Sequence, residues 1–273
     1  MPSERPGGTE VSEPVVLLDH PAPGVARLLI NRPDKRNAID HAVREQLSAH
    51  LLALLADAGT RAVVLGGVGG IFSAGGDLPS MRGLSADEAR ARMQHIHLLC
   101  RIVAGSRLPV VSAMEGVAAG AVVGLALLGD HIVGGPGTRV LFPFLRLGLA
   151  PDWGQLLTLP RRVGIGAARR MLSSGLPVGG EEAQRLGLLD ALVPDDQVMA
   201  AAVRQASALA DLPQEAFSRM KQRLNAVSGS LAEELAREES DQVVCLLGDE
   251  FQEGYAAFAQ KRPPNFRPQE PQR

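Results

Sequence analysis

The chain has 273 residues, of which 45% are hydrophobic, 21% are charged and only 3% are aromatic. This composition excludes a disordered protein and fits one large α/β domain or a core with an appendage. A formal net charge of −2 argues against nucleic acid or an anionic membrane surface as the main partner. The two cysteines provide neither a disulfide framework nor a metal-ligand spacing, so we expect a cytoplasmic protein without a bound metal.

The polar segment 1–13 is expected to be a loose tail, and residues 14–208 are expected to form the core. Short β-rich runs alternate there with helical patterns, which predicts an α/β fold. Strands are expected at Val15–Leu18, Val25–Ile30, Ala62–Leu65, Pro109–Ala113 and His131–Gly134, with a Pro/Gly turn at Pro21–Gly24. One helix is expected to begin after Asp40, which can cap it. Two further helices are expected at Ser85–Ala104 and Ala118–Leu128.

The last part of the chain, residues 209–273, is expected to be a helical segment, because the pattern past Asp195 is only helical. An apolar stripe follows helical spacing there, formed by Val243, Leu247, Phe251, Tyr255 and Phe258. Such a stripe packs either on the core of its own chain or on another subunit, and its spacing does not distinguish the two.

Two glycine-rich loops follow predicted strands. The first is Gly69–Leu78, and the second is Glu115–Ala121, just before an apolar helix. Small residues let a ligand approach the backbone, and free N–H groups at a helix start bind negative charge. Two such loops could supply two N–H donors to one oxygen, which is an oxyanion hole. Taken singly, each loop is better explained as a tight turn, and neither has the Gly-Lys-Ser/Thr of a phosphate-binding loop.

In order and with their neighbours, these loops resemble the crotonase superfamily, the enoyl-CoA hydratase/isomerase family. The resemblance extends over residues 14 to 266 and rests on Asn31–Ala38, Phe72–Leu78, Pro109–Gly120, Leu147–Asp152, Leu159–Gly164, Glu182–Leu189 and Phe258–Pro264. It implies a spiral of ββα units with an α-helical C-terminal trimerisation segment, in a homotrimer or homohexamer. It also implies a CoA thioester substrate and no permanently bound cofactor.

The resemblance also assigns roles to single residues. The backbone N–H groups of Gly76 and Ala121 would form the oxyanion hole, although position 121 is usually glycine in the family. The positions that contact CoA are matched by Arg36, Ala38, Ala74, Asp77 and Leu78. Phe258 and Lys261 match a C-terminal pair that closes over CoA from a neighbouring subunit, and a solvated helix end is an equally good interpretation of Lys261.

The chain departs from the family where hydration is decided. Hydratases hold a water between two glutamates, and the resemblance places those positions at Gly124 and Phe144. Ordinary hydration is therefore not expected. Asp152 is the remaining acid, at a position where relatives that shift double bonds carry an aspartate. Desolvation would raise its pKa toward a useful range for proton transfer. A helix N-cap after Pro151 is the alternative role for this side chain.

Two other functions stay open. Asp152 could act as the nucleophile of a dehalogenase or hydrolase on an aryl- or acyl-CoA, with His97 assisting. Alternatively, the chain could be a CoA-thioester-binding subunit without turnover. The substrate pocket is expected to accept an apolar or aromatic acyl group. Its expected residues are Phe142, Phe144, Trp153 and His97, together with the segment 81–92.

Overall fold

The computed structural model describes residues 14–267, so the expected tail at 1–13 lies outside the described residues. Its larger sheet has six strands in the order β1-β2-β3-β4-β6-β9. The strands are β1 (Val16–Ala22), β2 (Val25–Ile30), β3 (Ala62–Gly67), β4 (Val110–Met114), β6 (His131–Gly134) and β9 (Ala191–Leu192). Strands β1 and β2 form an antiparallel hairpin, and every later pair is parallel. Strands β3 and β4 are buried along their whole length, as expected for parallel strands covered on both faces.

A second sheet has the order β5-β7-β8, with β5 (Val117–Ala119), β7 (Arg139–Leu141) and β8 (Val178–Gly179). Isolated parallel bridges join Ile39 to Gly76 and Ser73 to Ala118. The second of these bridges brings the two glycine-rich loops next to each other.

Five helices lie between or beside these strands: α1 (His41–Ala56), α2 (Ala86–Ala104), α3 (Ala121–Leu127), α4 (Gln155–Ser174) and α5 (Gly180–Arg185). Short 3-10 turns occur at Pro33–Lys35, Val68–Gly70, Leu78–Met81, Phe144–Leu147 and Asp195–Gln197. The expected cap at Asp40 is confirmed, because its side chain accepts a hydrogen bond from Val43 N. Ser85, expected as the first residue of a helix, instead precedes α2 as its cap and forms a capping box with Glu88.

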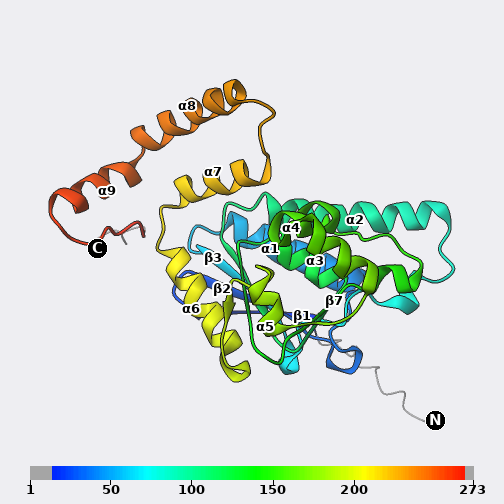
Figure 1. The fold of residues 1–273 in the computed structure, drawn as a ribbon. Helices are drawn as coiled ribbons and strands as arrows, with labels where there is room; N and C mark the ends of the chain where they lie inside the picture. Colours follow the sequence, from blue (N-terminus) through cyan, green and yellow to red (C-terminus); the bar gives the residue numbers. More distant parts are fainter. Residues whose placement is uncertain (1–13, 268–273) are drawn as a thin grey trace, which may run out of the picture.

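Helix α6 (Val198–Ala210) covers one face of the larger sheet, and α1, α2 and α3 lie on the other side (Figure 1). The core is mostly aliphatic, as the scarcity of aromatic residues predicts. The larger of its two clusters joins α1, α2 and α3 to the sheet and also contains Phe142, Phe144 and Trp153. The arrangement confirms the expected α/β fold.

Most expected boundaries lie within two residues of those in the structure, and two cases differ in a way that matters for the fold. Strand β1 runs to Ala22, so the turn is limited to Pro23 and Gly24 rather than spanning Pro21–Gly24. The expected helix at Ala118–Leu128 is divided: Val117–Ala119 pairs with β7 as a strand, and the helix begins only at Ala121. Gly120 makes the change of direction, with a positive φ of 50° that a side chain would strain.

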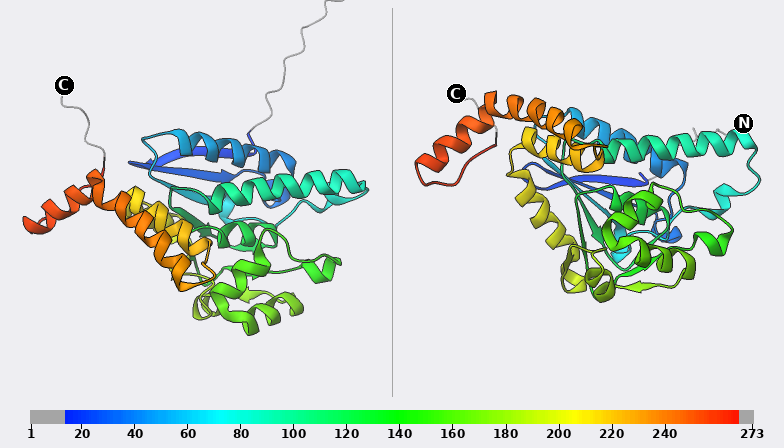
Figure 2. Two further views of the ribbon diagram at one scale, coloured as in Figure 1. Left: turned by 90° about the horizontal axis from the view of Figure 1, so that it is seen from above. Right: turned by 45° about the horizontal axis from the view of Figure 1, so that its top comes forward.

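The C-terminal helices α7 (Gln214–Asn225), α8 (Leu231–Leu247) and α9 (Asp249–Ala259) follow α6, whose last turn contains the expected boundary at residue 208. Helices α8 and α9 project away from the body as an arm (Figure 2). All members of the apolar stripe are exposed on this arm, up to 84% for Phe258. In the described chain the stripe therefore does not pack on the core. No helix among residues 14–267 is both long and apolar enough to cross a membrane.

Candidate active site

A cavity of about 700 Å³ opens between the first half of α2, the loop that precedes it, the start of α3 and the segment before α4. Its wall is mostly apolar, with contributions from Ile39, Met81, Leu84, Met93, Phe144 and Leu149. The charged residues on the wall are Arg36, Arg92 and Asp152. A largely apolar cavity with a few convergent polar groups is the usual form of a small-molecule site.

Two backbone N–H groups on this wall, those of Gly76 and Ala121, make no backbone hydrogen bond within the described residues. At the parallel bridge, Ile39 N donates to Gly75 O over 2.7 Å, and Asp77 N donates to Ile39 O over 3.0 Å. The N–H of Gly76 lies between these two links and takes part in neither. Ala121 is the first residue of α3, so its N–H has no carbonyl one turn earlier to bind. Both residues line the cavity, where their N–H groups can bind developing negative charge.

The first loop needs glycine for a steric reason. Gly75 has a φ of 100°, and a Cβ built there would lie 2.8 Å from the carbonyl oxygen of Ala119. The two loops therefore touch through their backbones, and only a residue without a side chain permits it.

Asp152 is the acidic side chain of the cavity wall. Its Oδ1 atom is buried and has no hydrogen-bond partner among the described residues. Burial raises the pKa of this carboxyl, while the positive charges of Arg92 and His97 oppose the rise. The alternative role as a helix cap is wrong, because α4 begins after Gly154 and has no side-chain cap. The contact of Asp152 with the start of α4 is made by its carbonyl oxygen, which accepts hydrogen bonds from the backbone N and the Nε2 of Gln155.

Trp153 occupies the space that a side chain at position 124 would need. The residue is 2% exposed, and its Cβ would lie 2.4 Å from a Cβ built on Gly124. The Nε2 atom of Gln155 would lie 3.0 Å from the same Cβ. Neither Gly124 nor Phe144 carries an acid, and the packing around Gly124 leaves no room for one.

We therefore expect Gly124→Glu to lower the free energy of unfolding by about 1–3 kcal/mol, because the added side chain overpacks against Trp153. We also expect no gain of hydration. Urea unfolding and a crotonyl-CoA hydration assay measure the two effects. Gly166→Ala is the matched control, since the nearest atom to its added Cβ is a flexible Arg170 nitrogen at 3.7 Å. Wild-type stability together with new hydratase activity would contradict the packing argument.

The residues matched to CoA contacts are divided by the structure. Arg36, Ala74 and Leu78 lie on the cavity wall, whereas Ala38 and Asp77 do not. The Asp77 carboxylate instead accepts a 3.1 Å hydrogen bond from Arg32 and so braces the loop.

Asn37 is a structural residue of this site that sequence reasoning missed. It is fully buried, and its Nδ2 donates to the carbonyls of Val68 and Ile71. Its Oδ1 accepts from the Arg32 N–H, so one amide joins the segment after β2 to the loop after β3. Asparagine also tolerates the positive φ of 58° found there.

Four other expected site residues do not lie on the cavity wall. Phe142 was expected in the substrate pocket, but it is completely buried in the core. His97 is exposed on α2. Phe258 and Lys261 are exposed at the end of the arm. Any role of this last pair at a cavity would therefore involve another copy of the chain.

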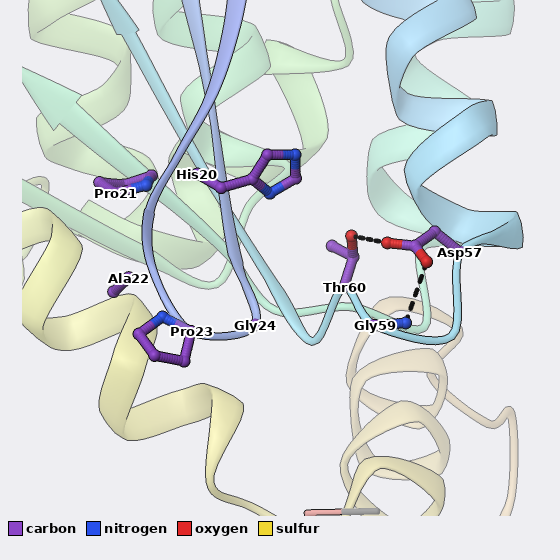
Figure 3. Close-up of a pocket in the computed structure, with 8 residues that line it drawn as sticks. All are labelled: His20, Pro21, Ala22, Pro23, Gly24, Asp57, Gly59 and Thr60. Atoms are coloured by element: carbon purple, nitrogen blue, oxygen red, sulfur yellow. Dashed lines mark hydrogen bonds between the residues drawn. The ribbon is translucent and has the colours of Figure 1, made fainter. Parts of the chain in front are cut away.

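A second hollow, of about 540 Å³, lies at the β1–β2 turn and the loop between α1 and β3 (Figure 3). It shares no residue with the cavity of Asp152. Its acidic side chain, Asp57, already accepts hydrogen bonds from Gly59 N and Thr60 Oγ1. The cavity that contains Asp152 is therefore the better candidate for the active site.

Comparison with known proteins agrees with this geometry. The family model described as enoyl-CoA hydratase/isomerase matches residues 21–269. The 1,2-epoxyphenylacetyl-CoA isomerase of Escherichia coli K12 is 31% identical, over 92% of this chain and 97% of that protein. The 2,3-dehydroadipyl-CoA hydratase of the same organism is 34% identical, over 89% and 95%. The crystal structure of an enoyl-CoA hydratase from Bacillus anthracis superposes with a TM-score of 0.87 at 26% identity, over 93% of this chain and 99% of the other. The chain therefore belongs to the enoyl-CoA hydratase/isomerase family, within the crotonase superfamily.

Proposed function

We propose that this acyl-CoA enzyme shifts a double bond in an enoyl-CoA, with Asp152 as the acid/base. The carboxylate takes a proton from C2 of a 3-enoyl thioester, and the electron pair moves onto the thioester oxygen. The N–H groups of Gly76 and Ala121 stabilise that oxyanion. The protonated Asp152 then returns the same proton to C4, which gives the 2-enoyl product without water or redox change. The observation that carries this proposal is that Asp152 is the only carboxylate on the described cavity wall.

Hydration is the less favoured activity, although the names of the relatives include both hydratases and an isomerase. Adding water requires groups that hold the water and groups that donate and accept protons. Trp153 and Phe144 are apolar where those groups would stand, so they exclude water instead of orienting it. A single carboxylate is enough for isomerisation, because one proton is removed and returned.

The two alternatives differ from this proposal in what they need. A nucleophilic Asp152 would need a base to activate water for hydrolysis, and His97 is exposed outside the cavity wall. A subunit that only binds CoA thioesters has no need for an acid in the apolar cavity, where burial makes the charged carboxylate costly.

Three substrates separate these functions. A 3-enoyl-CoA, a 2-enoyl-CoA and a halogenated aryl-CoA are each incubated with the full chain, and the products are separated by chromatography and identified by mass spectrometry. A new product of unchanged mass from the 3-enoyl-CoA supports the isomerase. Water uptake by the 2-enoyl-CoA at a typical enzyme rate of about 10 per second would overturn the proposal in favour of hydration. Halide release would indicate the nucleophilic mechanism, and tight binding without turnover would indicate the inactive subunit.

We also propose a homotrimer or homohexamer in the cytoplasm. The exposed arm supports the oligomer, because α8 has no buried residue while its apolar side chains face outward. Light scattering at micromolar concentration tests it, and a monomer would contradict it.

The pH dependence of the reaction follows from the raised pKa of Asp152. The base must be a carboxylate, so kcat/KM is expected to fall as the pH drops through this raised pKa, above the range of an ordinary aspartate. Arg92 lowers the pKa, so Arg92→Gln should move the acidic limb to a still higher pH. The measurement is a pH profile of kcat/KM for both proteins. An acidic limb that stays in place in the variant would contradict the assignment of that limb to Asp152.

A further inference from the structure

The cavity contains a second charged group that the proposed reaction does not use. Arg92 lies on α2 and lines the cavity together with Asp152. Its Nη2 lies 3.6 Å from the point that a Cβ on Gly76 would occupy, with Met81 Cε closer to the same point at 2.4 Å, so the guanidinium is near Gly76. The residue is half-buried and is not part of the CoA-contact motif.

The guanidinium has no hydrogen bond or ion pair within residues 14–267. Burial lowers the pKa of Arg92, and the charges of Asp152 and Asp77 oppose this effect through space without bonding to it. Asp77 is already held by Arg32 at 3.1 Å. Five N–H donors in a mostly apolar cavity thus lack a partner that the described chain could supply.

The surroundings add positive charge to this wall. Arg44 on α1 is 2% exposed, and its Nε and Nη1 atoms have no hydrogen-bond partner among the described residues. Burial and the nearby charge of Arg92 lower the pKa of Arg44 to about 10, and Asp40 opposes them. Asp40 is shared with Arg32, at 3.1 Å. Neither Arg92 nor Arg44 has a carboxylate of its own in a hydrogen bond or ion pair among the described residues, and this favours an anion or a strong acceptor from outside the chain.

We propose that Arg92 binds an oxygen atom on the third carbon of the acyl group, so that the site selects 3-oxoacyl-CoA thioesters over unsubstituted ones. This inference rests on the proposed function only for the position of the thioester oxygen at Gly76 and Ala121, and it concerns a 3-oxoacyl ligand and not the 3-enoyl substrate. In a 3-oxoacyl thioester, a single carbon, C2, joins the thioester carbonyl to the C3 carbonyl. The C3 oxygen therefore lies close to the thioester oxygen and to Gly76. A carboxylate at the far end of a long acyl chain would lie away from Gly76 and would not meet this guanidinium.

The role also fits the chemistry of Asp152. Removal of a proton from C2 of a 3-oxoacyl thioester spreads negative charge over both oxygens. Gly76 and Ala121 stabilise the charge on one oxygen, and the planar fork of Arg92 stabilises the charge on the other. No co-reactant is needed, since the proton moves from C2 to Asp152.

Binding of acetoacetyl-CoA and butyryl-CoA tests the proposal, because the two ligands have the same chain length and differ at the C3 oxygen. Calorimetric titration of the full chain is expected to show at least about tenfold tighter binding of acetoacetyl-CoA. Arg92→Gln should abolish this preference and leave butyryl-CoA affinity unchanged. The matched control is Arg90→Gln on the same helix, since the Arg90 side chain is 72% exposed and is expected to leave the preference intact.

Circular dichroism measures whether each variant is folded. Arg92→Lys is a second variant, which keeps the positive charge but lacks the planar guanidinium, and we expect it to show an intermediate preference for acetoacetyl-CoA. Equal binding of the two ligands by the wild type would overturn the proposal, as would a preference that survives Arg92→Gln. Equal weakening of both ligands in that variant would also overturn it, since Arg92 would then act on the common part of the ligand. The assay requires no turnover, so failed isomerisation with an intact preference would refute only the proposed function.

Discussion

Asp152→Asn is expected to lower kcat for isomerisation of a 3-enoyl-CoA by at least about 100-fold, with little change in the affinity for the thioester. Asparagine has nearly the same shape but cannot accept the proton from C2. The oxyanion hole and the apolar wall remain in place, so binding should persist. The measurements are single-turnover kinetics for the chemical step and calorimetry for binding.

The same variant should not be less stable than the wild type. Burial raises the pKa of Asp152 above its unfolded value, so its interaction with the fold is most favourable below the unfolded pKa. That contribution is lost as the pH rises through the raised folded value, which makes the carboxylate a cost at neutral pH. Asparagine carries no charge, so the midpoint of thermal unfolding is expected to be equal or higher at pH 7.

Asp196→Asn is the matched control, because Asp196 is exposed and lies outside the cavity. It should change neither rate nor stability. An unchanged isomerisation rate in Asp152→Asn would remove Asp152 from the mechanism. A large loss of stability in that variant would instead mean that the carboxylate supports the fold. That result would contradict the expectation drawn from its Oδ1, which has no hydrogen-bond partner among the described residues.

Sequence patterns predicted the local elements well, because their causes are local. The strands at Val25–Ile30 and His131–Gly134 have the predicted limits, and the cap at Asp40 is a short-range signal. The strand at Val117–Ala119 could not be read in this way. Its apolar run is typical of a helix, and only its pairing with β7, some 20 residues later, makes it a strand.

In the candidate site, too, the features set by local sequence were predicted and the features set by long-range packing were not. The motifs located Asp152 and the two loops, since these depend on residue type and order. They did not reveal that Trp153 fills the space at Gly124, because this contact joins positions 29 residues apart (153 − 124 = 29). They also gave no role to the charge of Arg92, which lay inside a segment expected to shape the pocket. Its meaning depends on the absence of a partner, and only a structure of the surrounding residues can provide that information.

The C-terminal helices are attached to the core by an ion pair whose lysine is buried and whose aspartate side chain is 16% exposed, and its removal should have the largest effect on stability. Lys221 on α7 is 3% exposed, and its Nζ donates to Asp130 Oδ2 over 2.6 Å and to the carbonyl of Leu108 over 3.2 Å. Burial lowers the pKa of this amine, while Asp130 opposes the change. The ammonium therefore connects α7 to the loop before β4 and to the loop before β6.

Lys221→Met keeps most of the side-chain volume but leaves the Asp130 carboxylate with one fewer partner. Its remaining hydrogen bond comes from Val110 N, over 2.8 Å. Loss of one member of a buried ion pair typically costs about 3–5 kcal/mol, and we expect a decrease of that size in the free energy of unfolding by urea. Lys35→Met is the matched control, since Lys35 is exposed and should change stability by less than about 0.5 kcal/mol.

The double variant Asp130→Asn, Lys221→Met separates the two possible causes of the loss. If the unpaired carboxylate causes the instability, the asparagine should recover part of it, because a neutral amide buries no charge. If lost packing of α7 causes it, the double variant should be at least as unstable as Lys221→Met. A decrease below about 1 kcal/mol in Lys221→Met would mean that α7 is held by its apolar contacts, such as the buried Phe217, and not by the ion pair.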